Sequence, residues 1–185
     1  MNLAETVSRS IEELKGVADA LSSTEMTSLA REMAEARRIA LYGVGREGLV
    51  MRGLAMRLYH LGLDAHVVGS MDCPPIGKGD SLIVSAGPGS FSTVLALMNV
   101  ASNAGARTVV FTAEPSGAAA RLADAVFKVP AQTMASDRAA RESLLPMGSL
   151  YELSLWLYCD LFVLALQERL GVSYDKMRSR HTNLE

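Results

Sequence analysis

Gly43, Gly45 and Gly48 have the spacing G-x-G-x-x-G, inside the stretch IALYGVGREGLVMRGLAMRLYHLG at residues 39–62. An apolar run precedes these glycines and a helical pattern follows them, which is the context in which the motif binds the phosphates of a dinucleotide. The same spacing is typical of a tight turn with close packing of the following helix. The motif therefore has two interpretations, a nucleotide-binding loop and a structural turn.

A second glycine-bearing loop, SAGPGSFST at residues 85–93, also joins a predicted strand to a predicted helix. Two such loops at the carboxyl ends of neighbouring parallel strands suit a small anionic or polyhydroxyl ligand. A dinucleotide fits less well, because two predicted helices precede the first strand. A dinucleotide-binding fold also has an acidic residue after its second strand, and the only candidate for it is Asp72, which lies in a predicted loop. Dinucleotide binding therefore ranks last among the functions considered.

Other residues that could do chemistry have structural interpretations when they are taken alone. Ser149 and Glu152 have the spacing S-x-x-E of a capping box at the start of the last long helix. Arg46 can pair with Glu47 or with another acidic neighbour. We expect the two cysteines to be reduced thiols. Neither metal-ligand spacing nor C-x-x-C spacing occurs among the histidines and cysteines, which are His60, His66, His181, Cys73 and Cys159.

The hydrophobic pattern predicts helices that alternate with short apolar strands. The predicted helices cover residues 3–21, 24–36, 47–61, 92–104, 117–123 and 149–170. The predicted strands are RIALYG, DAHVVG, SLIVSA, RTVVFTA and DAVFKVP. Alternation at this spacing predicts a parallel sheet with helices on both faces. We expect residues 131–148 to form an irregular crossing segment, and the tail after residue 171 is polar and charged.

The last predicted helix is apolar almost all round over LSLWLYCDLFVLAL, residues 153–166. A helix on the surface of a single domain shows a polar face, so a homo-oligomer interface is the expected cover. Asp160 interrupts this run, and we expect it to have a hydrogen-bond or charge partner. The run is too short to span a bilayer.

Length and composition are those of one globular domain with a substantial core. The chain has 185 residues, 49% of them apolar and 21% charged, and its net charge is −2. No basic run stands out, so nucleic acid is not expected as a partner. The N-terminal stretch MNLAETVSRSIEELK lacks the apolar segment of a secretory signal. We therefore expect a cytoplasmic protein that binds neither nucleic acid nor a membrane.

Together these motifs resemble those of the sugar isomerase (SIS) domain family, most closely its 6-phospho-3-hexuloisomerases. The most specific parts are GVGREGLVMRGLAMRLYHLG, MGSLYE and the terminal RHTNLE, and the resemblance covers essentially the whole chain. It implies a single SIS domain over residues 1–185: a flavodoxin-like, three-layer α/β/α sandwich around a five-stranded parallel sheet, with N-terminal helices and a long apolar C-terminal helix. It also implies a homodimer or homotetramer that works without a metal or an organic cofactor.

The resemblance further implies interconversion of D-arabino-hex-3-ulose 6-phosphate and fructose 6-phosphate. Glu152 in GSLYE is then the catalytic base, and His181 in RHTNLE is the proton-transfer partner, reaching a neighbouring subunit's site. Moving a ketone between adjacent carbons passes through an enediol. A carboxylate can carry the carbon-bound proton, and an imidazole can exchange protons with the oxygens. Arg46 would hold an anionic group of the substrate or steady the enediolate.

Both glycine loops depart from the family pattern. Glu47 stands where the family has serine, and alignment of the second loop with S-G-S-G-E-T puts Ala86, Pro88 and Phe91 at positions of hydroxyl residues. Because a carboxylate repels a phosphate dianion and Pro88 lacks a backbone donor, we expect a changed substrate, with or without a phosphate at that position. The predicted substrate-binding residues are Gly43, Gly45, Arg46, Glu47, Ser85, Gly87, Gly89, Ser90 and Ser92, with Thr93 as a further replacement hydroxyl.

A second class of function remains open, that of a non-catalytic protein that binds or senses a sugar or sugar phosphate. A sensor would need neither Glu152 nor His181. It would also normally be fused to a DNA-binding module, for which the chain has no spare residues. These features favour the enzyme.

Overall fold

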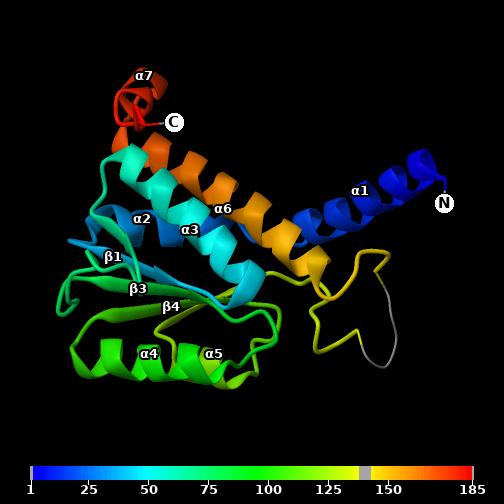
Figure 1. Cartoon of the computed structure of the whole chain (residues 1–185), viewed down its shortest axis with the longest axis horizontal. Helices are drawn as coiled ribbons and strands as arrows, with labels where there is room; N and C mark the ends of the chain where they lie inside the picture. The colour runs from blue at the N-terminus through cyan, green and yellow to red at the C-terminus, as the bar shows by residue number, and fades with distance from the viewer. Residues whose placement is uncertain (1, 138–142, 185) are drawn as a thin grey trace.

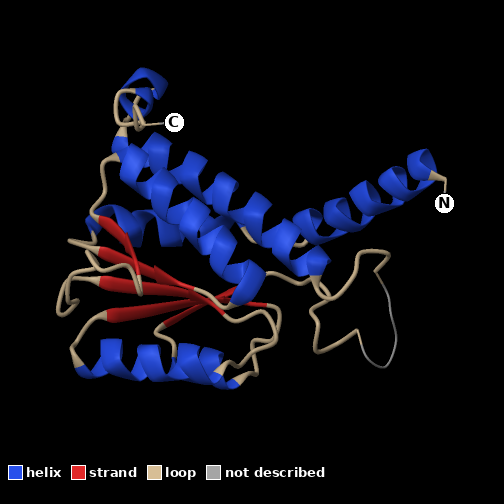
Figure 2. Ribbon diagram, in the orientation of Figure 1, coloured by secondary structure: helices blue, strands red, loops and turns tan. Residues whose placement is uncertain are grey.

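Five parallel strands form the centre of the computed structural model, which describes residues 2–137 and 143–184. The strands are β1 (Ile39–Tyr42), β2 (Ala65–Val67), β3 (Ser81–Ser85), β4 (Arg107–Thr112) and β5 (Ala125–Lys128). Their order across the sheet is β2-β1-β3-β4-β5, and every neighbouring pair is parallel. Figure 2 shows this sheet between two helical layers. The predicted parallel sheet is confirmed, and its order reverses direction between β1 and β3.

Helices cover both faces of the sheet. The helices of the described residues are α1 (Leu3–Asp19), α2 (Ser23–Glu35), α3 (Gly45–Leu61), α4 (Ser92–Asn103), α5 (Ala118–Leu122), α6 (Ser149–Leu170) and α7 (Tyr174–Arg178), of which α2 to α6 cover the sheet. Figure 1 shows α4 and α5 on one face and α2, α3 and α6 on the other. The three-layer α/β/α sandwich is therefore confirmed.

Alternating strand residues supply two separate apolar cores, because successive side chains of a strand point to opposite faces. Ile83 and Phe111 belong to the core shared with α2, α3 and α6. Val84 and Val110 belong to the core shared with α4 and α5. All four side chains are fully buried. Because both faces of these strands are covered, their sequences are continuous apolar runs rather than alternating apolar and polar residues.

Helix α6 is buried on one side and exposed on the other. Leu155 and Phe162 are buried against the core, whereas Trp156 and Leu164 are about half exposed. The apolar run 153–166 was predicted to be too short to span a bilayer, but by length and composition alone the whole helix α6 is long and apolar enough to cross one. Half of the most apolar stretch of α6 is nevertheless buried inside the fold, as in the core helix of a globular protein. Asp160 lies on the exposed side, so the premise that it needs a protein partner is wrong.

Helix α1 extends away from the rest of the protein (Figure 1). Only Val17 of this helix is buried, and the apolar side chains of Leu3, Val7 and Ile11 are exposed. Near its C-terminal half, Glu13 accepts hydrogen bonds from the Ser143 hydroxyl at 2.5 Å and the Leu144 N–H at 2.9 Å. The helix thus contacts the segment that leads into α6.

The tail after residue 171 and the crossing segment 131–148 are two parts of the chain for which no helix or strand is predicted. The tail contains the short helix α7, whose N-cap Ser173 accepts a hydrogen bond from the Lys176 N–H at 3.2 Å. The described parts of the crossing segment 131–148 contain turns and neither helix nor strand before Ser149, in agreement with the prediction. Residues 138–142 of that segment lie outside the described residues.

Candidate active site

The first glycine loop joins β1 to α3 in a tight turn. A Cβ atom on Gly48 would lie 2.5 Å from the carbonyl oxygen of Gly43, so the close approach of these two backbones requires glycine. Val44 is the N-cap of α3 and supplies no side-chain hydrogen bond. The structural interpretation of the motif is therefore confirmed. The turn also leaves the first N–H groups of α3 without a side-chain cap.

The second loop places another uncapped helix beside the first. Strand β3 lies next to β1, and residues 86–91 connect it to α4, whose N-cap Phe91 supplies no side-chain hydrogen bond. The carboxyl ends of β1 and β3 are where the order of the sheet reverses, which is the usual ligand position in sheets of this kind. The expectation that both loops lie at one edge is confirmed.

Helix α6 begins at the same edge, but without the predicted capping box. Gly148, in the left-handed conformation at φ 83°, is the N-cap, and Ser149 is already helical. The Ser149 N–H donates to the carbonyl oxygen of Pro146 at 2.9 Å, and the Glu152 N–H donates to that of Gly148 at 3.2 Å. The capping box is wrong because the glycine turn starts the helix one residue before a Ser149 cap would. The Glu152 side chain is therefore not used as a cap.

The starts of α3 and α6, with Phe91, line a cavity of about 340 Å³. Its volume is within the range of small-molecule sites. Two of the lining residues form an ion pair, between the Arg46 Nε and the Glu152 Oε2. Arg46 was predicted to pair with Glu47 or with another acidic residue, and the second of these is correct. The Glu152 side chain is 15% exposed and that of Arg46 65% exposed. The lining residues are Val44, Gly45, Arg46, Glu47, Phe91, Met134, Pro146, Met147, Ser149 and Glu152.

Glu47 is buried and lines this cavity. Its Oε2 accepts hydrogen bonds from the Ser85 hydroxyl at 2.5 Å and the Gly87 N–H at 3.0 Å. The Ser85 hydroxyl also lies 3.1 Å from the Tyr151 hydroxyl. Burial raises the pKa of Glu47. The hydrogen bonds from Ser85 and Gly87 oppose this rise, and the negative charge of Glu152 adds to it.

This network changes what the second loop can offer to a ligand. Ser85 and Gly87 already donate to Glu47, so neither donor is available to hold a phosphate. Ser90, Ser92 and Thr93 are exposed, and within the described residues their hydroxyls have no hydrogen bond. The free donors of the loop therefore lie at the N-terminus of α4.

Tyr151 belongs to this network, although the sequence does not predict it as a site residue. Its ring is fully buried and its hydroxyl contacts Ser85. Burial, followed by the charge of Glu47, raises the pKa of Tyr151. Because α6 is almost entirely apolar, the sequence predicts that Tyr151 is only a core residue. Its part in the hydrogen-bond network is visible only from the tertiary contact with Ser85.

His181 lies far from this cavity in the same chain. Its ring stacks on that of His60, with ring centroids 5.3 Å apart, where α3 ends. The two histidines line a second cavity of about 370 Å³ with Arg57, Asp160 and Arg178. Roughly 27 Å of helix separates Glu152 from the C-terminal end of α6, beside which this cavity lies. The structure therefore does not bring His181 and Glu152 together within one chain.

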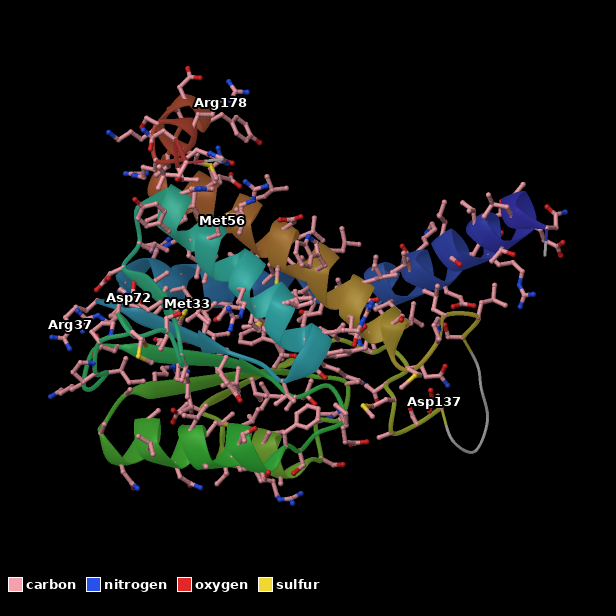
Figure 3. The ribbon with its side chains drawn as sticks, viewed as in Figure 1. Met33, Arg37, Met56, Asp72, Asp137 and Arg178 are labelled. Atoms are coloured by element: carbon pink, nitrogen blue, oxygen red, sulfur yellow. The ribbon has the colours of Figure 1, made fainter. Side chains whose placement is uncertain are left out.

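Asp72 does not lie where a dinucleotide would need it. Figure 3 shows it on the side of the sheet where Arg37 lies, rather than beside the loop at residues 43–48. It is exposed and follows the end of β2 by five residues. The low rank of dinucleotide binding agrees with this placement.

The sequence is similar to one protein family and to named proteins. The sequence model of the SIS domain matches residues 32–156. A Bacillus subtilis protein named 3-hexulose-6-phosphate isomerase is 31% identical over 185 residues, which is the whole of both chains. A Mycobacterium gastri protein of the same name is 36% identical over 174 residues, covering 94% of this chain and 87% of its own.

The fold is similar to that of a solved structure along its whole length. A crystal structure of a hypothetical protein from Methanococcus jannaschii matches with a TM-score of 0.83 and 28% sequence identity, covering all of both chains. The description of that structure infers a molecular function of 3-hexulose-6-phosphate isomerase. Sequence and fold therefore point to the same relatives along the full length of the chain.

Proposed function

The chain belongs to the SIS domain family and is a sugar-phosphate isomerase, and we propose that it interconverts a 3-hexulose 6-phosphate and its 2-keto isomer. The observation that carries the proposal is the placement of Glu152. Its carboxylate lines a ligand-sized cavity at the edge where α3, α4 and α6 all begin without side-chain caps. Uncapped helix N-termini favour an anionic ligand, and a carboxylate can move a carbon-bound proton.

In the proposed reaction Glu152 is the catalytic base. It takes the proton from the carbon next to the ketone, and the electrons of that C–H bond form the double bond of an enediol. It then returns the proton to the former ketone carbon, so that the ketone moves by one position. One carboxylate can serve both carbons from one face of the sugar, because the carbons are neighbours and the side chain is held by Arg46.

Arg46 is proposed to position Glu152 and to stabilise negative charge on the substrate oxygens. Its guanidinium already pairs with Glu152, and it is exposed enough to turn toward a bound anion. A guanidinium presents several donors in one plane, so it can contact the base together with a substrate oxygen on which negative charge develops.

The phosphate is proposed to bind at the N-terminus of α4. Ser90, Ser92 and Thr93 present exposed hydroxyls there, and the first backbone N–H groups of the helix have no side-chain cap. This position replaces the one in the glycine turn that Glu47 has taken, which reconciles a phosphorylated substrate with the departures in the two loops. Gly89 would shape this loop, while Gly43 and Gly45 shape the first.

His181 is proposed to act in the site of a neighbouring subunit, since it lies at the opposite end of α6 from Glu152 in its own chain. The half-exposed apolar side chains of α6, Trp156 among them, support a homodimer or homotetramer. We further propose that residues 1–185 form one SIS domain, that the protein is cytoplasmic, and that side chains alone carry out the reaction.

The proposal is tested by incubating the purified protein with D-arabino-hex-3-ulose 6-phosphate and measuring formation of fructose 6-phosphate. We expect turnover of this substrate and at least tenfold lower kcat/KM for the same sugar without its phosphate, because the free donors of α4 would then have no anion. Equal rates on both sugars would contradict the proposed phosphate site. No turnover of the phosphorylated sugar would contradict the proposed substrate.

A further inference from the structure

The two carboxyl oxygens of Glu47 differ in their hydrogen bonds within the described residues: Oε2 accepts from protein donors and Oε1 does not. Both hydrogen bonds of its carboxyl among the described residues, from Ser85 and from Gly87, reach Oε2. The residue also lines the cavity that Glu152 lines. Since Oε2 already accepts two donors, a proton on this carboxyl group belongs on Oε1.

The surroundings of Glu47 favour its neutral form. Among the described residues its contacts are hydroxyl and amide groups, and Arg46 pairs with Glu152 rather than with Glu47. The titratable groups that face it are Tyr151, which stays neutral, and Glu152, which is negative. A buried carboxyl next to another carboxylate, with no cation of its own, retains its proton to higher pH than usual.

The reaction needs proton carriers for oxygens as well as for carbon. When Glu152 removes the carbon-bound proton, negative charge develops on the ketone oxygen, and a proton delivered there lowers the barrier. Glu152 cannot deliver it, because it is taking up the carbon proton in the same step. The cavity is lined by a second carboxyl group, that of Glu47.

We propose that Glu47 is the general acid that protonates the ketone oxygen of the substrate, an inference that rests on the proposed isomerase function. As the C–H bond breaks toward Glu152, the Oε1–H bond of Glu47 breaks and its proton joins the ketone oxygen, which gives a neutral enediol. The adjacent hydroxyl then loses its proton to the neighbouring subunit's imidazole as the new ketone forms and Glu152 reprotonates carbon. Water carries the proton from the imidazolium to the Glu47 carboxylate, which restores both groups.

The substitution Glu47→Gln separates this role from a structural one. The glutamine carbonyl oxygen can accept the same hydrogen bonds from Ser85 and Gly87, so the variant keeps the network, but its amide cannot donate an acidic proton. Glu114→Gln is the matched control. Glu114 is an exposed carboxyl group on the same edge of the sheet, where it bonds to Ser116 and lies outside the Glu152 cavity.

The first measurement is turnover of D-arabino-hex-3-ulose 6-phosphate as a function of pH. We expect Glu47→Gln to lower kcat by roughly a hundredfold with KM little changed, because general acids contribute about that much or more. The decline of parental kcat at high pH, where Glu47 loses its proton, should be absent from the variant. Parental kcat in Glu47→Gln, with Glu114→Gln also parental, would overturn the proposal.

The second measurement needs no substrate. Infrared difference spectra between the parent and Glu47→Gln at neutral pH should show the C=O band of a protonated carboxyl group in the parent, and the Glu114→Gln difference should show only an ionised one. An ionised Glu47 would overturn the proposal. A protonated Glu47 in a protein that does not turn over the hexulose phosphate would instead contradict the proposed substrate, so the two failures are distinguishable.

Discussion

The aspartates at the amino edge of the sheet and Glu47 at the carboxyl edge are held in opposite ways. At the amino edge, Asp64, Asp80 and Asp124 directly precede β2, β3 and β5. Asp80 is buried and accepts hydrogen bonds from Arg37 Nε and Nη2 at 2.8 and 2.7 Å and from the Gly77 N–H at 2.8 Å. The Arg37 guanidinium, which bonds to it, lowers the pKa of Asp80.

The other amino-edge carboxyl groups follow the same rule. Asp124 accepts hydrogen bonds from the Thr108 N–H and hydroxyl at 2.8 and 2.9 Å, and the N–H bond is the largest cause of its lowered pKa. The hydrogen bond with His66 lowers the pKa of Asp64. Each carboxylate is fully paired and joins the start of one strand to a neighbouring segment, so this edge is built for stability.

At the carboxyl edge, the pairing is incomplete. Burial raises the pKa of Glu47, and the four helices α3 to α6 begin there without a side-chain cap. By contrast, α1, α2 and α7 have the side-chain caps Asn2, Ser22 and Ser173. Figure 3 shows Arg37 at one end of the sheet and Asp137, in the segment that leads to α6, beyond the other. The aspartates at the strand starts are therefore paired for stability, whereas the edge that holds Glu47 leaves, among the described residues, helix N–H groups and the Ser90, Ser92 and Thr93 hydroxyls free for a ligand.

The largest expected effect at the carboxyl edge is complementation between subunits. Glu152→Gln and His181→Asn should each lower turnover by roughly a hundredfold or more, since each removes a positioned proton carrier. If His181 serves a neighbouring subunit, subunits of the two inactive variants, mixed by unfolding and refolding together, should regain activity, because some sites then contain both intact residues. Light scattering on the mixture and on each variant checks that all are oligomers of equal size.

Two results would contradict the shared site. An active and monomeric parent would show that no neighbour is needed. Inactive mixtures that contain mixed oligomers would show that His181 does not complete the site of another subunit.

A smaller effect is expected at the amino edge, on stability rather than on turnover. Asp80→Asn removes the ion pair with Arg37 and should lower the melting temperature by about 5 °C at neutral pH, with kcat of the folded protein unchanged. The folded-state pKa of Asp80 is lowered, so its contribution is present above the unfolded-state value of about 3.9 and is lost as the pH falls through the folded-state pKa. Calorimetry between neutral and acidic pH should therefore show the deficit shrinking on acidification. A deficit in kcat comparable to that of Glu152→Gln would contradict the division between the edges.

Most of the fold could be predicted from the sequence, because its signals are local. The apolar strands and the helix periods follow from the spacing of side chains, and the predicted bounds of α6 match its structure. The two loops could be predicted from their glycines between an apolar strand and a helix, whereas the catalytic role of Glu152 rests on the family resemblance and stays a prediction. The capping box failed because the S-x-x-E spacing cannot show that Gly148 starts the helix in a left-handed conformation.

The contacts of Glu47 could not be predicted, because they are tertiary. The sequence showed a carboxyl group at a phosphate-binding position, and the prediction was repulsion of a phosphate. The structure adds that this carboxyl group takes the Ser85 and Gly87 donors for itself and that Tyr151 closes the network. Which donors remain free depends on residues up to 104 positions away from Glu47 in the chain (151 − 47).

The central claim, that Glu152 moves a carbon-bound proton at the carboxyl edge, is tested most directly by turnover in deuterated water. Glu152 is partly exposed, so a proton that it takes up can exchange with solvent before it is returned. We predict that the parent and Asp80→Asn incorporate deuterium at the substrate carbon, whereas Glu152→Gln, still folded and still binding the sugar phosphate, incorporates it at least a hundredfold more slowly. Incorporation by Glu152→Gln at the parental rate would contradict the claim.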